Sequence, residues 1–540
     1  MLGEAASAAN PEPLAVLVPG TGTYSRPISA DSSQAQAFFD QGLRLAWSFY
    51  FPESIASYQE AARLDPDNPM PYFGIAHAAG PNPNSRYQRL PDDPQSAGLA
   101  AIRKARALAH NATPLEQALI DALYVLYNKD AIANSQARDK AFVDAMRALH
   151  RKYPHDPDIA TLFGMAYMNT TRWDYWLADG SAKPGTAEAK AAFEAAMAVE
   201  PYHPGANHLY IHLMEASSQP ELAMPSAQKL EATAPIAGHM VHMPGHIYLR
   251  VGDYEKVVRS NERSQVVDKH FARIWGDTHF PMIGTYHLSH KLHAPHALDF
   301  VRYANILQGN YAEASRAATE AAGDPGADPA MINRSQKRLA QQWLVDKIFG
   351  RWDAILGNTK PLTATPYLAG MWHYVKGSAW VARGQLDQAQ AALDILREQI
   401  GKESVDTTGV DPTPASHLLS IAAKGLEGEL HEARGELKPA IEAYRVAVSL
   451  QDANSYIEPP DWPQSMRLYL GAALLADHQA AAAEKVYRKD LEWNQQNGWA
   501  TLGLLQSLKA QGKNEEAEVT ARQFEAYWRN ADTELKRSRI

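Results

Sequence analysis

Cysteine is absent from all 540 residues of the chain. Its absence excludes disulfide bonds, thiolate metal ligands and cysteine nucleophiles. The chain also lacks any apolar run of about 18 residues, the length that a membrane-spanning helix needs. Basic residues are fewer than acidic ones, with 52 lysines and arginines against 61 aspartates and glutamates and a net charge of -9. We therefore expect no membrane span and, because no basic run interrupts the chain, no nucleic-acid partner.

Several catalytic signatures are missing as well. The segment GTGTYS at 20–25 lacks the lysine of a phosphate-binding loop, and neither a GxSxG elbow nor an HExxH zinc motif occurs. The opening segment MLGEAASAAN includes Glu4 and no apolar core, so we expect no intact signal peptide. A cytoplasmic location and, with a signal already removed, a periplasmic or secreted one both stay open.

What the chain does have is a repeated helical pattern. Tyr58, Ala61 and Pro66 stand at mutual spacings of three and five, and the segment FEAAMAVEPYHP repeats those spacings. Elsewhere a small residue follows a glycine by five positions, as in ARGELKPAIEAY. The glycine ends one helix in a left-handed cap, the small residue lets the next helix approach closely, and the aromatic ring fills the gap. The pattern resembles the tetratricopeptide repeat, whose period is about 34 residues.

These repeats predict an all-α fold, a tetratricopeptide-like superhelical solenoid of roughly ten to twelve helical pairs. We expect residues 1–30 to form an extended N-terminal segment and residues 31–540 a continuous solenoid. A helix at about 515–535 would cap its end. The histidine-rich region 203–300 lies inside the solenoid and carries an insertion at 265–295 that breaks the period.

Histidine is concentrated in this region, which holds twelve of the 20 histidines. The pair His208 and His212 recurs one repeat period later as His242 and His246. Equivalent positions of successive repeats line up across a solenoid, with helix axes about 8–10 Å apart. We therefore expect these imidazoles to face one another.

A third repeat extends the register. Once the insertion is allowed for, the pair His239 and His242 recurs as His296 and Asp299. Residues three, four and seven apart share one face of a helix, which also adds Glu215 to the first of these faces. Three neighbouring first helices would then present imidazoles and carboxylates to a common point. By resemblance to tetratricopeptide proteins, that point lies in the concave groove.

Paired imidazoles at this spacing are typical ligands of a divalent transition metal. Neutral imidazole suits copper, zinc and iron, and the number of donors fits one or two ions. The alternative is a polar groove that binds an anionic ligand or a peptide without metal. The predicted ligands are His208, His212, His239, His242, His246, His296 and Asp299.

Histidines outside this register have other expected roles. We expect His203 and His270 to be buried structural histidines. Four histidines of the insertion would supply further ligands or a lid, namely His279, His287, His290 and His293.

Two loop motifs supply candidate substrate-binding and catalytic groups. In GPNPN, the amides of Asn82 and Asn84 would bind substrate. In EPPDWP, the Trp462 ring would contact substrate and Glu458 would act as a general base. Glu215 would orient a ligand or move a proton. Turn formation and helix capping, which asparagine, aspartate and proline also serve, are the alternative for both loops.

The chain also resembles a bacterial family of stand-alone tetratricopeptide proteins over nearly its whole length. The resemblance depends on FDQGLRLAWSF, NHLYIHLMEAS, AGHMVHMPGHIYLRVGDY, EPPDWP and NGWATLGLLQSL. Relatives typically read His-Asn-x-His-Phe where this chain reads HALDF at 296–300, so Asp299 departs from the family pattern. The resemblance implies the repeat fold and the histidine site, and it implies no particular reaction.

Together these features predict a metal-dependent enzyme built on a solenoid, with its site in the concave groove. A ligand set dominated by imidazole, with no obvious hydrolytic carboxylate, favours oxidoreductase over hydrolase chemistry. A small-molecule substrate or a peptide would occupy the groove. The alternative is a non-catalytic scaffold that binds a peptide or partner protein, or a metal carrier.

Overall fold

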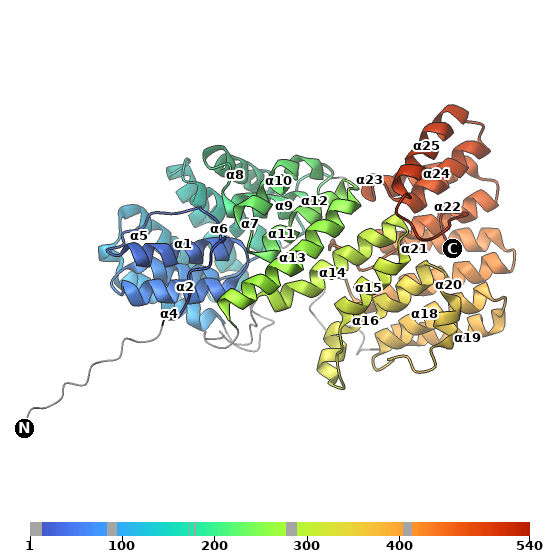
Figure 1. Ribbon diagram of the computed structural model, residues 1–540, viewed down its shortest axis with the longest axis horizontal. Coiled ribbons are helices and arrows are strands. Elements are labelled where there is room, and N and C mark those ends of the chain that lie inside the picture. Colours follow the sequence, from blue (N-terminus) through green and yellow to red (C-terminus); the bar gives the residue numbers. More distant parts are fainter. Residues whose placement is uncertain (1–12, 84–93, 172, 178–179, 277–288, 403–412) are drawn as a thin grey trace, which may run out of the picture. The chain divides into compact units, whose positions relative to one another are not determined.

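The computed structural model is a succession of α-helices (Figure 1). It describes residues 13–83, 94–171, 173–177, 180–276, 289–402 and 413–540. Within these ranges there is no β-strand, and an isolated bridge joins Trp176 and Ala182. The predicted all-α, tetratricopeptide-like class is confirmed, because short turns join consecutive helices that pack against each other.

The chain divides into two compact units. The continuous solenoid over 31–540 stays a prediction. Each unit contains part of the histidine-rich region 203–300, in which the insertion interrupts the repeat. The first unit comprises Met1–Ser217, Pro225–Met243 and Ser264–His293. The second unit comprises Ser218–Met224, Pro244–Arg263 and Ala294–Ile540.

The helices vary in length from a single turn to six turns. Up to residue 243 they are α1 (Ser33–Trp47), α2 (Phe51–Leu64), α3 (Pro69–Ala78), α4 (Pro94–Ala107), α5 (Pro114–Tyr127), α6 (Ser135–Lys152), α7 (Pro157–Thr171), α8 (Thr186–Val199), α9 (Pro204–Met214), α10 (Met224–Thr233) and α11 (Gly238–His242). They continue as α12 (Pro244–Arg250), α13 (Tyr254–Trp275), α14 (Ser289–Gln308), α15 (Tyr311–Ala322), α16 (Pro329–Ile348), α17 (Trp352–Gly357), α18 (Pro366–Ala382) and α19 (Leu386–Ile400). The last are α20 (Ala415–Ala433), α21 (Leu437–Asp452), α22 (Met466–Ala476), α23 (Ala480–Trp493), α24 (Gly498–Ala510) and α25 (Asn514–Tyr527). Among the described residues, none of these helices combines the length and the hydropathy needed to cross a membrane.

Many helices begin at a capping side chain followed by proline. At α3, Oδ1 of Asn68 accepts a hydrogen bond from the Met70 N–H at 2.9 Å. At α5, Thr113 and Glu116 form a reciprocal capping box. Proline occupies the first turn of both helices, where its missing N–H leaves no intrahelical bond unmade.

Several helical hairpins turn at a glycine in the left-handed conformation. Gly309 (φ 77°) stands two residues before α15, and Gly435 (φ 78°) stands two residues before α21. Glycine adopts this conformation without strain because it has no Cβ. The predicted glycine stops are confirmed at these two turns.

Aromatic rings fill the space between paired helices where glycine lines the neighbouring helix. A Cβ added to Gly42 or Gly74 would lie 2.8 Å or 2.4 Å from the Tyr58 ring. Gly428 stands against the Tyr444 ring in the same way, at 2.3 Å. These contacts are closer than a methyl group allows, so the helices approach because the glycines have no side chain.

Non-helical segments precede and follow the helices. Residues 13–32 contain no helix, and within them the Leu14 N–H donates to Oε2 of Glu60 at 2.9 Å. The final helix, α25, is shorter than the helix predicted at about 515–535, and residues 528–540 continue without helix. There the Ser538 hydroxyl donates to a backbone carbonyl of α22 at 2.8 Å.

Candidate metal centre

Two of the predicted ligands lie on α9 in the first unit. His203 caps this helix, since its Nδ1 accepts from the Ala206 N–H at 3.0 Å, and Pro204 occupies the first turn. His208 and His212 then fall about one turn apart on the same face. Both side chains are buried, and their ring centres are 5.0 Å apart.

His239 joins this pair from the short helix α11. Its Nε2 lies 3.0 Å from Nε2 of His208. Its ring centre lies 4.9 Å from that of His208 and 6.2 Å from that of His212. Two imidazole nitrogens at this distance either share a proton or face a common cation. All three histidines are less than a tenth exposed, so the cluster is enclosed.

Hydrogen bonds at the opposite ring nitrogens hold two of these imidazoles in place. Nδ1 of His208 lies 2.6 Å from the carbonyl oxygen of Trp47, so it carries the proton and donates. Nδ1 of His212 lies 3.2 Å from Oε1 of Glu215 and donates in the same way. In a neutral ring the other nitrogen, Nε2, then has a lone pair, which is the form that binds a metal ion.

Phe49 covers the three imidazoles from the turn between α1 and α2. Its ring centre lies 4.4 Å from that of His208, 5.3 Å from that of His239 and 5.9 Å from that of His212. The rings of Phe49 and His212 are nearly parallel, with an angle of 9° between their planes. An aromatic ring in this position excludes water from one side of the cluster and strengthens electrostatic interactions within it.

Phe49 reaches this position through an unusual backbone conformation. Its φ is 60°, in the left-handed region. It stands two residues before α2, the place that Gly309 and Gly435 hold before α15 and α21. A residue with a Cβ loses roughly 1–2 kcal/mol in this conformation. Phenylalanine in the place of glycine is therefore strained, and strain of this kind is concentrated at functional sites.

His208, His212 and His239, which we call the histidine triad, form a donor set suited to one transition-metal ion. One nitrogen from each residue lies within 4.8 Å of the other two. Zinc binds imidazole nitrogen at about 2.0–2.1 Å, so small ring movements would bring all three nitrogens to one ion. Three protein ligands leave a fourth tetrahedral position open.

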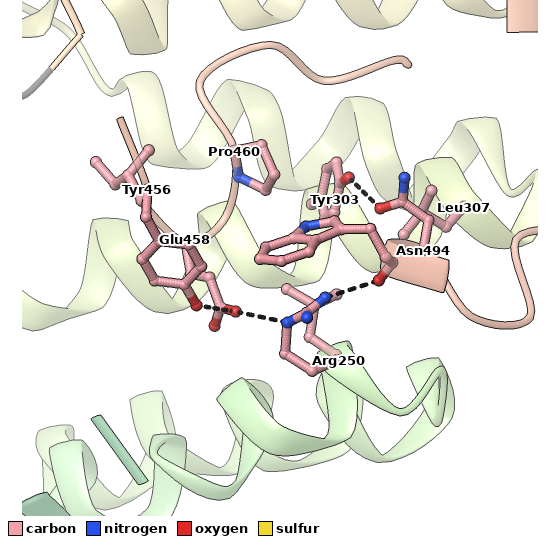
Figure 2. Close-up of a pocket in the computed structure, with 10 residues that line it drawn as sticks. Arg250, Tyr303, Leu307, Tyr456, Glu458, Pro460 and Asn494 are labelled. Atoms are coloured by element: carbon pink, nitrogen blue, oxygen red, sulfur yellow. Dashed lines mark hydrogen bonds and ion pairs between the residues drawn. The ribbon is translucent and has the colours of Figure 1, made fainter. Parts of the chain in front are cut away.

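His246 and His296 belong to the second unit. Their ring centres lie 6.0 Å apart. Nδ1 of His246 lies 2.9 Å from Oε2 of Glu458. The other oxygen of Glu458 accepts a hydrogen bond from the Tyr456 hydroxyl (Figure 2). Glu458, the predicted general base, thus holds the His246 ring by its Nδ1 proton.

Arg250 is the cationic partner of Glu458 in this part of the second unit. Its Nε lies 4.0 Å from Oε1 of Glu458, and its guanidinium stacks 3.4 Å above the Trp493 ring. Figure 2 shows these side chains lining a pocket together with Tyr303 and Asn494, which are joined by a hydrogen bond of 3.2 Å. Burial raises the pKa of Tyr303, so its hydroxyl stays protonated and donates to the Asn494 carbonyl oxygen.

Two other predicted site residues of the second unit have different surroundings. Oδ2 of Asp299 lies 2.8 Å from Nε of Arg338, and Oδ1 lies 3.7 Å from Nη2 of Arg302. The charge of this predicted ligand is therefore balanced by arginine. Trp462 is buried in the hydrophobic core, where its ring centre lies 5.6 Å from that of Tyr374.

In the first unit, Asn82 is buried just after α3. His242, at the end of α11, is fully buried, with its ring centre 5.7 Å from that of His239. Other predicted residues lie outside the described side chains, namely Asn84, His279, His287 and His290.

Of the two histidines that we expected to be buried, His203 is buried and His270 is exposed. His203 is fully buried, and its Nε2 lies 3.1 Å from Oδ1 of Asp158, as expected of a core histidine. His270 is exposed on α13, so its predicted burial is wrong. The adjacent Phe271 is fully buried, so it is Phe271 that turns toward the core at this point of the helix.

Sequence reasoning did not find the α1–α2 turn, although it supplies the Trp47 carbonyl and the Phe49 ring. The available signal is the segment AWSFYFPES, in which phenylalanine stands where other hairpins have glycine. The Trp47 contribution has no sequence signal, because any residue presents a backbone carbonyl.

Fold and site together define a tetratricopeptide-like helical protein with an enclosed imidazole cluster. No family model matches the chain, and no curated protein does. Among solved structures it is similar to the human IFIT1 dimer with m7Gppp-AAAA, at 12% identity over 81% of this chain and 86% of that chain, with a TM-score of 0.34. It is also similar to yeast Tom70, at 9% identity over 91% of this chain and 90% of that chain, with a TM-score of 0.30. Likeness this distant carries no argument about activity.

Proposed function

We propose that this chain is a transition-metal-binding tetratricopeptide-like protein whose histidine triad holds an ion. The observation that supports it best is the convergence of three buried imidazoles, with Nε2 of His208 and of His239 3.0 Å apart. Imidazole nitrogen is a ligand common to copper, zinc and iron. A single cation would satisfy several of these nitrogens at once.

The surroundings of the triad favour a cation. The Trp47 carbonyl and the Glu215 carboxylate hold the Nδ1 protons of His208 and His212. Such outer hydrogen bonds orient each ring and raise the basicity of its coordinating nitrogen. Phe49 excludes water from one side, which strengthens the attraction between the nitrogens and an ion.

The number of ligands favours catalysis at this ion as a second candidate function. Catalytic zinc sites have three protein ligands and an open fourth position, whereas structural sites are closed by four. A bound ion would supply Lewis-acid or redox chemistry there. Because an all-imidazole set suits copper and iron, oxidoreductase chemistry is preferred over hydrolysis.

Metal analysis of the purified full-length protein tests the proposal. We expect a stoichiometric transition metal by mass spectrometry after gel filtration, and its loss in the double variant His208→Ala/His212→Ala. His270→Ala, which removes an exposed histidine of the same unit, is the matched control and should keep the metal. Circular dichroism establishes that each variant folds.

The possible results separate the candidate functions. A protein that is purified without metal and does not take up zinc, copper or iron on titration contradicts the proposal, and peptide capture unchanged in the double variant would then favour a scaffold. Reversible metal uptake without turnover of any substrate favours a carrier. Turnover that requires the ion favours the enzyme.

A further inference from the structure

Two more imidazoles lie next to the histidine triad in the first unit. His242 ends α11, His293 lies on α14, and both side chains are buried. Their ring centres are 4.8 Å apart. The ring centre of His239 lies 5.2 Å from that of His293 and 5.7 Å from that of His242. The triad therefore continues into a further group of histidines.

These spacings match rings that share one ion. Zinc lies about 2.0–2.1 Å from a coordinating nitrogen and the ring centre roughly 1 Å further out, so two rings at a tetrahedral angle have centres about 5 Å apart. The 4.8 Å between His242 and His293 meets this condition. So does the 5.0 Å between His208 and His212 within the triad.

Asp268 sets the orientation of His293. Its carboxylate is buried on α13, and Oδ2 lies 3.0 Å from Nδ1 of His293. The ring donates its Nδ1 proton to the carboxylate, which makes Nε2 the coordinating nitrogen. Glu215 holds His212 by the same kind of contact in the triad.

The other oxygen of Asp268 is fixed as well. The Tyr50 hydroxyl donates to Oδ1 of Asp268 and accepts from the Gly238 N–H at 2.9 Å. A Cβ added to Gly238 would lie 2.1 Å from Oδ1 of Asp268, so glycine is needed where α11 begins. With both oxygens engaged, the Asp268 carboxylate is fixed in place and fixes the His293 ring in turn.

We propose that His242 and His293 hold a second transition-metal ion beside the triad, with Asp268 as the positioning residue of His293. The proposal rests on the proposed function, because it takes the triad to be the neighbouring metal position. The chemical class of ligand is a divalent ion that accepts imidazole, such as zinc or copper. Water would complete its coordination, and His239 is adjacent to both positions.

Zinc titration of the full-length protein, stripped with a chelator, tests this inference. We expect the wild-type protein to retain two zinc ions after desalting, and His293→Ala and His212→Ala to retain one each. Asp268→Asn should lower the affinity for the second zinc ion by about 10–100-fold, measured by competition with a chromophoric chelator. His270→Ala lies on the same helix as Asp268 and is the matched control, which should retain two ions.

The outcomes distinguish the two proposals. If the wild-type protein and His293→Ala both retain one ion, and His212→Ala retains none, the second position is absent while the triad stands. If the wild-type protein retains none, both proposals fail. Two ions in His293→Ala, or none in a folded His293→Ala, would show that His293 does not define a separate position. Thermal unfolding reports the folding of each variant, and His293→Gln replaces the alanine variant should that one not fold.

Discussion

Phe49 combines a strained backbone with a ring that contacts three imidazoles. The left-handed conformation at the end of α1 suits glycine, yet only a large side chain can reach His208, His212 and His239 from this turn. The turn is therefore less stable than its glycine counterparts by about 1–2 kcal/mol.

Replacing Phe49 by glycine and by alanine separates these two effects. Both variants lose the ring, so both should bind zinc less tightly than the wild-type protein. Only glycine relieves the backbone, so Phe49→Gly should exceed Phe49→Ala in free energy of unfolding by about 1 kcal/mol, measured by urea denaturation of the metal-free proteins. In ordinary helical or extended backbone the order is reversed. Equal stabilities would show that the turn is not strained.

His77 is a second residue whose environment has a measurable consequence. It is buried with its ring centre 5.3 Å from that of Trp47, and burial lowers the pKa of His77 from 6.5 to about 4, against the opposing charge of Asp158. The folded protein therefore keeps this ring neutral, whereas the unfolded chain binds a proton below about pH 6.5. Stability is complete above that pH and declines as the pH falls toward 4.

The variant His77→Phe should remove this dependence. Between pH 7 and pH 5 the wild-type protein should lose about 2 kcal/mol of unfolding free energy relative to the variant. Urea denaturation at the two pH values measures the difference, and the other titrating groups cancel in the comparison. Parallel pH profiles for the two proteins would contradict the buried neutral state of His77.

At the scale of elements, glycine and tyrosine pairs account for the close packing of the hairpins. Gly428 lies in the interior of α20, where alanine would favour the helix by about 1 kcal/mol on propensity alone. The ring of Tyr444 leaves no room for the Cβ that alanine would add at this position. Propensity and packing therefore predict opposite signs for the same substitution.

We expect packing to dominate, so Gly428→Ala should lower the free energy of unfolding by about 1–3 kcal/mol. The control is Gly357→Ala at the end of α17, where an added Cβ meets no atom within 4 Å. It should leave the free energy within about 0.5 kcal/mol of the wild-type value. Thermal and urea unfolding of the two variants test this, and a neutral Gly428→Ala would mean that α20 and α21 can separate slightly.

Periodicity predicted much of this architecture. The spacing of Tyr58 and Ala61 indicated paired helices, and glycine stops such as Gly435 indicated their turns. The repeat period also related the pair His208 and His212 to the pair His242 and His246 of the next repeat. It placed His239, His242 and His246 on one helix, but Pro244 starts a new helix, α12, after the five residues of α11. Proline cannot donate the hydrogen bond that would join them.

Contacts between distant segments could not be predicted in this way. The carbonyl of Trp47 and Nδ1 of His208 are separated by 161 positions in the chain. The pairing of Asp268 with His293 falls in an insertion that has no repeat register to extend. Such partners depend on the tertiary packing of the first unit, which no local pattern records.

At the scale of the whole molecule, the histidine triad and its supporting residues all belong to the first of the two compact units. A ligand that binds only the folded form stabilises it by about 2.7 kcal/mol at one hundred times its dissociation constant. Zinc should therefore slow amide hydrogen exchange in α9, α11 and the α1–α2 turn. Helices α20 to α23 of the second unit should exchange as before.

Hydrogen-exchange mass spectrometry of the metal-free and zinc-loaded protein measures this pattern. The variant His208→Ala/His212→Ala with the same zinc concentration is the control and should show no slowing. Equal slowing in both units would show that the ion acts elsewhere or that the units unfold as one.

The 161-position separation between Trp47 and His208 also has a consequence for biosynthesis. At about 5–20 residues per second, a ribosome makes the second partner roughly ten to thirty seconds after the first. The three imidazoles of the histidine triad lie within 31 positions of one another, but the Trp47 carbonyl and the Phe49 ring that surround them come from a segment made much earlier. The enclosure of the triad by Trp47 and Phe49 is therefore completed only when the two segments pack together in the folded first unit.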